Sequence, residues 1–285
     1  MTFLLTPQEE TTKISYLVIL DYSYIWEKDS MQNRFIVSPF FLDKAVPGLE
    51  SLAKSDWVLN QPQLPEGDQQ TRMAAIYRPM ADLVAETTKD GERPVIIAGD
   101  CCTPIPVLAG IQRAGLHPML LWFDAHGDFN TWETTPNGFL GGMPLAMLVG
   151  RGEQTLVNAV GLHPHPEGQV ILSDARDLDP GERDALRASE ILHVPRTNDL
   201  CDYPLLQGPL FIHFDVDVIR TEDVPAVSYP AAGGISAAEL REVFQYLAQA
   251  AQIVAVSVAS WNPEADTDGK SQAVCMELLH ALIGS

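Results

Sequence analysis

The sequence has little positive charge and few cysteines. Its 18 lysine and arginine residues are outnumbered by 38 aspartate and glutamate residues, so the formal net charge is −20. Such a surface repels phosphates, which argues against DNA, RNA or an anionic membrane as a partner. We therefore expect a small-molecule substrate or a protein partner, with no nucleic-acid or membrane binding.

The sequence also lacks segments that direct a chain into or across a membrane. The N-terminal stretch MTFLLTPQEETTK has no basic segment followed by a long apolar one and a cleavage site, so no secretion signal is predicted. No apolar run is long enough to span a bilayer. The cysteines, which form neither a zinc-finger pattern nor a dense disulfide framework, are Cys101, Cys102, Cys201 and Cys275. Together these absences predict a reducing, cytoplasmic location.

What the sequence does contain is a series of short apolar runs with helical segments between many of them. The expected strands cover residues 14–20, 56–60, 94–99, 118–123, 168–173, 190–194, 209–214 and 252–258. Continuous apolar runs of this length suit strands buried on both faces, as in parallel sheets. Helices are predicted in 67–88, 236–250 and 271–284, the second with Ser236 as its cap and Glu239 three residues later. No repeat or long linker is found, so we predict one α/β domain over residues 1–285.

Three of the predicted strands lead into side chains that bind metals. The strands at 94–99, 118–123 and 209–214 are followed by Cys101, by Asp124, His126 and Asp128, and by Asp215 and Asp217. Ligand sites of open parallel sheets lie at the carboxyl ends of the strands. Residues two apart in an extended segment point to the same side, so each cluster can share a face. The sequence therefore predicts one pocket at the three strand ends.

The chemistry of these side chains indicates a metal site. Singly, an Asp at a strand end is more often a helix cap, and a His more often a satisfied hydrogen-bonding group. Gathered together, four carboxylates would repel one another and have raised pKa values unless a cation lay among them. Carboxylate-rich sites with one imidazole favour ions such as Mn²⁺, and shared carboxylates hold two ions at bridging distance. A pair of divalent ions is the prediction.

At these residues the chain resembles the ureohydrolase superfamily, which includes arginase, agmatinase, guanidinobutyrase and formimidoylglutamase. The family's Gly-Gly-Asp-His corresponds to AGDC (98–101), Asp-Ala-His-x-Asp to DAHGD (124–128) and Ser-Phe-Asp-x-Asp to HFDVD (213–217). GGIS (233–236) is similar to the family's Gly-Gly-Leu-Ser, and the likeness spans residues 94–265. It implies a three-layer α/β/α fold on a mainly parallel eight-stranded sheet. It also implies a homo-oligomer with a binuclear Mn²⁺ cluster, whose activated hydroxide hydrolyses linear amidines or guanidines.

The resemblance further implies a role for each candidate residue. The metal ligands would be Cys101, Asp124, His126, Asp128, Asp215 and Asp217. Asp124 and Asp215 would bridge both ions, Cys101 and Asp128 would complete one site, and the other two residues would complete the second. Asp128 is also the candidate catalytic residue.

Three positions depart from the family's motifs. Cys101 replaces a metal-binding His. A thiolate ligand favours Zn²⁺ or Fe²⁺ over Mn²⁺, and a site that holds a single ion is an alternative. The sequence is equally compatible with a buried Cys101 that binds no metal. Gly141 or Gly142 stands where arginases carry a His thought to shuttle protons. Ser260 replaces the glutamate that pairs with the substrate guanidinium. Without this charge partner, a cationic guanidinium is expected to bind weakly.

Other residues near the motifs are candidates for substrate binding. The segment DARDLDPGE (174–182) is similar to one in the arginase branch whose acids hold the substrate's α-amino group, which implies this role for Asp179 and Glu182. Asn130 matches a residue near the substrate carboxylate, and Ser260 completes the candidate set. The same DPGE is also a good turn and helix start, with Asp179 as the cap.

Several aromatic and imidazole side chains are weaker candidates. His163 and His165 lie in a proline-rich loop and are expected to be solvated. His213 precedes the Asp-x-Asp motif and could reach the site face or support a ligand. The tryptophans that either line the pocket or pack in the core are Trp122, Trp132 and Trp261.

The leading hypothesis is a metal-dependent hydrolase of non-peptide C–N bonds that is not an efficient arginase. One alternative is a degenerate family member that binds metal or regulates without catalysis. Another is a single-ion Zn²⁺ amidohydrolase that cleaves a neutral amide. Metal content per chain separates them, because two ions favour the first hypothesis and one or none favours the others.

Overall fold

The computed structural model of the chain describes residues 31–203 and 208–284. Its centre is a sheet in the order β4-β1-β5-β10-β9-β6-β7-β8, in which every neighbouring pair is parallel. The strands are β1 (Asn33–Ser38), β4 (Val58–Leu59), β5 (Arg93–Ala98), β6 (Met119–His126), β7 (Val170–Asp177), β8 (Leu192–Val194), β9 (Pro209–Asp215) and β10 (Gln252–Ala259). A small antiparallel pair, β2 (Phe40–Phe41) and β3 (Lys44–Ala45), follows β1.

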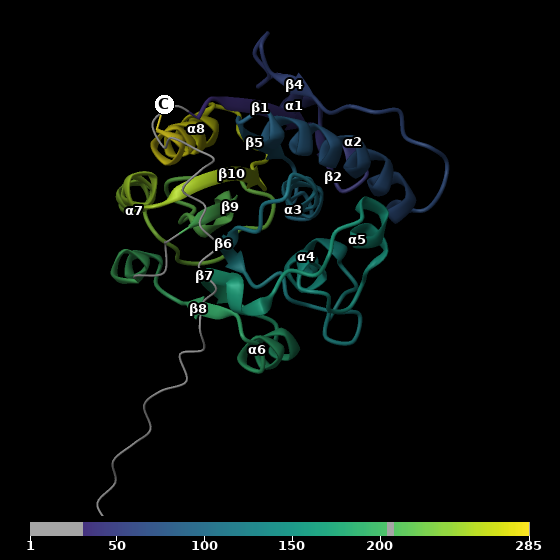
Figure 1. Ribbon diagram of the computed structural model, residues 1–285. Helices are drawn as coiled ribbons and strands as arrows, with labels where there is room; N and C mark the ends of the chain where they lie inside the picture. The colour runs from purple at the N-terminus through teal and green to yellow at the C-terminus, as the bar shows by residue number, and fades with distance from the viewer. Residues whose placement is uncertain (1–30, 204–207, 285) are drawn as a thin grey trace, which may run out of the picture.

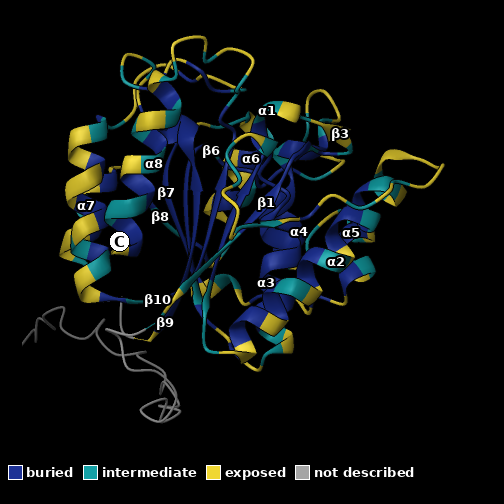
Figure 2. Cartoon of the chain, turned by 90° about the horizontal axis from the view of Figure 1, so that it is seen from above, coloured by how far each residue is buried: buried dark blue, intermediate teal, exposed yellow. Residues whose placement is uncertain are grey.

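Helices cover both faces of this sheet, so the predicted three-layer α/β/α architecture is confirmed (Figures 1 and 2). One layer contains α2 (Gln69–Lys89), α3 (Pro104–Arg113), α4 (Pro144–Leu148) and α5 (Thr155–Val160). The opposite layer contains α7 (Ala237–Ala250) and α8 (Lys270–Ile283). The shorter helices are α1 (Pro47–Glu50), α6 (Pro180–Arg187), and the 3₁₀ turns η1 (Leu140–Gly142), η2 (Glu167–Gln169), η3 (Thr197–Asp202) and η4 (Val216–Val218).

Strand alternation explains how one sheet supports two apolar cores. In β6, Leu120 and Trp122 face the α2–α5 layer, whereas Leu121 and Phe123 face the α7–α8 layer. All four side chains are fully buried. Such two-sided burial produces the unbroken apolar runs seen in the sequence.

Most of the predicted elements are present, with two differences. The predicted strands from 56–60 onward correspond to β4 to β10, whereas the run at 14–20 lies outside the described residues. The prediction missed β1, whose first half carries the polar Asn33 and Arg34 and is only partly buried. The capping box of α7 is confirmed, because Ser236 Oγ accepts from Glu239 N at 3.2 Å and Glu239 Oε2 accepts from Ser236 N at 3.1 Å. In the described part of the chain, no helix has the length and apolarity needed to cross a bilayer.

Candidate metal centre

The carboxyl ends of β5, β9 and β6 open into a cavity of about 620 Å³. The predicted site residues that line it are Cys101, His126, Asp128, Asn130, Asp179, Glu182, Asp215, Asp217 and Ser260. Asp124 is only 1% exposed and lies among the ligand groups described below. The expected convergence of three strand ends on one pocket is therefore present.

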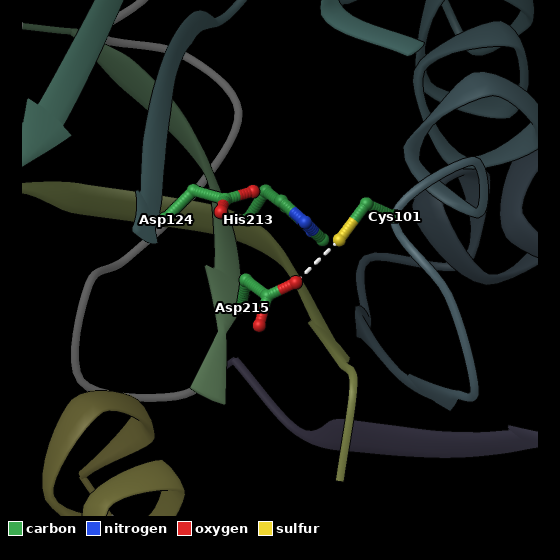
Figure 3. A group of neighbouring side chains, drawn as sticks. All are labelled: Cys101, Asp124, His213 and Asp215. Atoms are coloured by element: carbon green, nitrogen blue, oxygen red, sulfur yellow. Dashed lines mark hydrogen bonds between the residues drawn. The ribbon is translucent and has the colours of Figure 1, made fainter. Parts of the chain in front are cut away.

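The first group of ligand atoms comes from Cys101, Asp124, His213 and Asp215, all buried (Figure 3). These atoms lie within 4.8 Å of one another. The Cys101 thiol donates to Asp215 Oδ2 at 2.5 Å. Cys101, Asp124 and Asp215 were predicted as ligands from the sequence. His213 was only a weak candidate for reaching the site or supporting a ligand.

The second group comes from Asp124, His126 and Asp217, so Asp124 belongs to both groups. His126 Nδ1 lies 3.0 Å from Asp217 Oδ2 and 3.4 Å from Asp124 Oδ1. Burial alone would lower the pKa of His126, but these two carboxylates outweigh it and raise the pKa to about 12. The charged ring pairs with both carboxylates, whereas His126 as a metal ligand would bind in its neutral form.

Backbone hydrogen bonds hold the motifs in place. Asp124 Oδ1 accepts from the N–H of His126 at 2.7 Å, and Asp215 Oδ1 accepts from the N–H of Asp217 at 2.8 Å. Asp217 Oδ1 accepts from the N–H of Ala125 at 3.0 Å, which ties the end of β9 to the end of β6. Asp124 and Asp215 thus each fix the residue two positions later, a local geometry that Asp adopts readily.

Asp128 enters the cavity from a left-handed backbone conformation, with φ of 51°. Its carbonyl accepts from the N–H groups of Leu145 and Ala146, which anchors this turn to α4. Its buried Oδ2 has no hydrogen-bond partner among the described residues. Asp128 belongs to neither ligand group as the side chains stand, so its roles as ligand and catalytic residue stay predictions.

The electrostatics of the cluster suit divalent cations. Burial and neighbouring carboxylates raise the pKa of Asp215 and of Asp128 well above the usual range, and raise that of Asp217 to about 6. Burial and the same carboxylates also raise the pKa of the Cys101 thiol. Bound cations would relieve this repulsion. Asp128 Oδ2 and His213 Nε2 are buried without a hydrogen-bond partner among the described residues, and a bound ion would give such atoms a partner. The residues present therefore fit a metal centre.

Ser260 faces the ligand cluster more than the open cavity. It has a left-handed backbone conformation, with φ of 70°. Its hydroxyl donates to Asp215 Oδ2 at 2.5 Å and lies 3.6 Å from the Cys101 sulfur. Its predicted contact with substrate stays a prediction.

The predicted substrate-binding residues form one wall of the cavity. Asn130 Nδ2 donates to Asp179 Oδ2 at 2.9 Å. Glu182 accepts from the N–H of Phe129 at 2.8 Å through Oε1 and from the N–H of Asp179 at 3.1 Å through Oε2. Burial raises the pKa of Glu182 to about 7 despite these bonds. The helix start at Asp179 is therefore present, and the binding role stays a prediction.

The two glycines, one of which is predicted to stand in place of the arginase His, differ in the space around them. A Cβ at Gly141 would lie 2.4 Å from the Phe139 ring. At Gly142 the nearest such atom is Asn130 Nδ2, at 4.0 Å. Position 142 can therefore accommodate a side chain beside the cavity.

Three aromatic side chains that the sequence analysis did not select form another wall. Phe41, Phe139 and Tyr229 have ring centroids 5.1 to 6.4 Å apart and line the cavity. They come from β2 and from two loops, without any motif that would have marked them.

The remaining candidates lie outside the cavity. His163 is exposed as predicted, whereas His165 was wrongly expected to be solvated; it is 3% exposed, with Nε2 3.4 Å from the Gln169 carbonyl oxygen. Its buried position follows from the packing of this loop against α4, where the His165 N–H bonds to the Leu148 carbonyl. The tryptophans that do not line the cavity are Trp122 and Trp261, both buried, and Trp132, which is 47% exposed.

Fold and site together define an α/β/α protein whose parallel sheet carries two groups of side chains that could each hold a metal ion. A family model for the arginase family matches residues 58–284, and the chain belongs to that family. It is 33% identical to the arginase of Bacillus subtilis (strain 168) over 218 residues, which cover 72% of this chain and 73% of the relative. It is 31% identical to the N(omega)-hydroxy-L-arginine amidinohydrolase of Streptomyces lavendulae over 252 residues, which cover 87% and 85%.

Solved structures agree with this assignment. The crystal structure of Bacillus subtilis arginase has a TM-score of 0.75 at 26% identity, and the match covers 89% of this chain and 99% of that one. The formimidoylglutamase of Bacillus subtilis has a TM-score of 0.67 at 16% identity, with coverage of 91% and 89%. The second likeness shows the shared fold alone.

Proposed function

We propose that this chain is a metal-dependent hydrolase that cleaves a non-peptide C–N bond in a small amidine, guanidine or related molecule. The observation that carries the proposal is the pair of ligand groups that share Asp124 beside one cavity. Buried structural carboxylates are usually paired with basic groups, whereas here Asp124 and Asp217 share one imidazole and Asp215 has no ion-pair partner among the described residues. Membership of the arginase family supports the same class of reaction.

The first group would hold one divalent ion and the second group another, with Asp124 common to both. When bound, such ions supply Lewis acidity, which lowers the pKa of water to near neutrality. Carboxylates and imidazole suit Mn²⁺, whereas the Cys101 thiolate shifts the preference of its site toward Zn²⁺ or Fe²⁺. The metal identity therefore has to be tested with each ion.

Asp128 is the residue best placed to move a proton. Its Oδ2 is buried at the cavity wall and has no hydrogen-bond partner among the described residues. A carboxylate in this position can accept a proton from water and return it to a leaving nitrogen. Asp128 would perform this transfer in place of the missing arginase His.

The cavity walls restrict the substrate. Among the described residues, the cavity lining includes Asp177, Asp179 and Glu182 but no Lys or Arg, which disfavours an anionic substrate. Ser260 offers no charge to a guanidinium, so a reactive group that is neutral should bind better than that of L-arginine. The rings of Phe41 and Tyr229 favour an apolar or planar portion of the substrate.

The test is a substrate panel with purified protein loaded with Mn²⁺ or Zn²⁺. The panel contains L-arginine, Nω-hydroxy-L-arginine, agmatine, 4-guanidinobutyrate, weakly basic N-hydroxyamidines that are neutral near pH 7, and simple amides, and urea or ammonia release is measured. We expect turnover of such a neutral amidine or a related compound and its loss in Asp128→Asn. Hydrolysis of L-arginine at about 10 per second or more would contradict the substrate assignment, since that is the rate of an ordinary good enzyme.

A single-ion Zn²⁺ amidohydrolase is the second candidate function. The observation that favours it is the first ligand group, in which one thiol, one imidazole and two carboxylates make up the four ligands of a Zn²⁺ site. It predicts amide hydrolysis with one ion per chain. A non-catalytic family member instead predicts no turnover on the whole panel.

Three features of the molecule accompany the proposal as predictions. Two apolar cores against one sheet support a single domain across the described residues, and the predicted extent of this domain is 1–285. Four free thiols support a reducing, cytoplasmic location. Light scattering after gel filtration tests the expected homo-oligomer.

A further inference from the structure

We propose that His213 is itself a metal ligand and that it supplies, from β9, the imidazole that position 101 lacks. The inference rests on the metal dependence proposed above but does not depend on the substrate. In the motifs compared earlier, position 101 carries the imidazole and position 213 a serine. In this chain the two positions carry a thiol and an imidazole.

The position of His213 in the sheet directs its ring toward the cluster. His213 and Asp215 lie two residues apart in β9, so their side chains point to the same face. His213 lies opposite Trp122 of β6 and Ser257 of β10. Figure 3 shows its imidazole between Asp124 and Cys101, on the same side as Asp215.

Hydrogen bonding leaves one ring nitrogen of His213 available. Nδ1 lies 2.9 Å from Ser257 Oγ. In the tautomer in which the Nδ1–H donates to this hydroxyl, the lone pair lies on Nε2. Nε2 is buried and has no partner among the described residues. The side chain is 0% exposed, so water cannot reach it freely. An imidazole oriented through one nitrogen with the other free is the usual state of a metal-ligating histidine.

The four donor atoms lie near the spacing of a single metal site. The ligand atoms of Cys101, Asp124, His213 and Asp215 lie within 4.8 Å of one another. Donors around a tetrahedral Zn²⁺ ion lie roughly 3.3 to 3.8 Å apart, so side-chain shifts of about 1 Å complete the set. The result is a thiolate, imidazole and two-carboxylate site, which suits Zn²⁺ better than Mn²⁺.

A packing role alone does not account for this histidine. Its ring contacts Trp122, with centroids 4.1 Å apart, but a phenylalanine would make that contact as well. An unpartnered buried nitrogen costs about 1–3 kcal/mol, a cost that phenylalanine avoids. Metal ligation accounts for a ring nitrogen that is buried without a hydrogen-bond partner, whereas packing accounts only for the presence of an aromatic ring.

The first experiment compares metal binding by the wild-type protein and by His213→Phe. Elemental analysis gives ions per chain, and chelator competition gives the affinity for Zn²⁺ and for Mn²⁺. Phenylalanine keeps the ring volume, so we expect the metal-free variant to be folded and its Zn²⁺ affinity to be weaker by about 100-fold or more, since loss of an outer partner alone costs about 10–100-fold. The matched control is His165→Phe, which changes a buried imidazole outside both groups and should leave Zn²⁺ affinity unchanged.

The second experiment needs no variant and so does not depend on the folding of His213→Phe. The chain has seven histidines, and ¹⁵N-histidine labelling reports each ring nitrogen by NMR. We expect saturating Zn²⁺ to shift two imidazoles, those of His126 and His213. A His213 imidazole that Zn²⁺ leaves unshifted, or unchanged affinity in His213→Phe, would overturn the inference but not the metal site itself. A wild-type protein that binds neither ion would overturn both this inference and the proposed function.

Discussion

Glu182 provides a quantitative test of the electrostatics of the cavity wall. Its side chain is 3% exposed, and burial raises its pKa from 4.5 to about 7. The folded protein therefore binds the Glu182 proton more tightly than the unfolded chain between these two values. Replacement by glutamine keeps the size of the side chain but removes the titration.

The sign and size of the effect follow from proton linkage. Because the folded state binds more protons than the unfolded state, the free energy of unfolding falls as pH rises. The stabilisation is complete below about pH 4.5 and is lost as pH rises through about 7. The shift corresponds to about 3 kcal/mol, at about 1.4 kcal/mol per pKa unit. Glutamine also leaves one of the two N–H groups of Phe129 and Asp179 without an acceptor, which costs about 1–3 kcal/mol.

Urea unfolding of metal-free protein at about pH 5 and about pH 8 measures this effect. We expect Glu182→Gln to be less stable than wild type at the lower pH and at least as stable at the higher pH. The matched control is Glu239→Gln, which changes the same capping-box position in α7. Glu239 is exposed and its pKa is lowered by its hydrogen bonds to Ser236, so its stabilisation is present at high pH and lost at low pH. Equal pH dependence in wild type and Glu182→Gln would refute the reasoning.

Three further predictions concern the ligand cluster and the glycines. Saturating Zn²⁺ or Mn²⁺ at about 100 times its Kd should add about 2.7 kcal/mol of stability and raise the Tm by about 5 °C. Asp124→Asn should abolish most of this rise in a thermal melt, since both ligand groups share this carboxylate; an undiminished rise would place the ions elsewhere. Gly99→Ala should lower the free energy of unfolding by about 1–3 kcal/mol in urea titrations, because its Cβ would lie 2.4 Å from the Phe40 carbonyl oxygen. Gly142→His should raise kcat on a cleaved substrate by about 10-fold or more if a proton shuttle limits the rate. The non-shuttling Gly142→Gln should not, and equal rates in the two variants would exclude the shuttle.

The sheet was largely predictable because its strands are buried on both faces. The runs that became β5, β6, β9 and β10 are unbroken apolar segments, which need no knowledge of tertiary contacts. The strand β1 was missed because only Ile36, Val37 and Ser38 of it are fully buried. The pattern of apolar residues along the sequence thus identifies the central strands but misses a strand of which only half is buried.

The site was predictable only as far as its motifs reach. Strand alternation and the Asp-x-His-x-Asp spacing identified the carboxylates, because these signals are local. The place of His213 depends on the neighbouring strands β6 and β10, and that of Tyr229 on how a loop folds over the cavity. Neither arrangement is encoded in a short stretch of residues.

The strand order has a consequence for how the protein matures. Cys101 follows β5 and Asp215 ends β9, yet β10, the last strand in the chain, lies between these two strands. Cys101 therefore joins the other ligands of the first group only after residues 252–259 have been inserted into the middle of the sheet. A nascent chain on the ribosome would keep this thiol apart from them until almost all of the chain had emerged. Binding of an ion by the complete first group would accordingly distinguish finished molecules from incomplete ones.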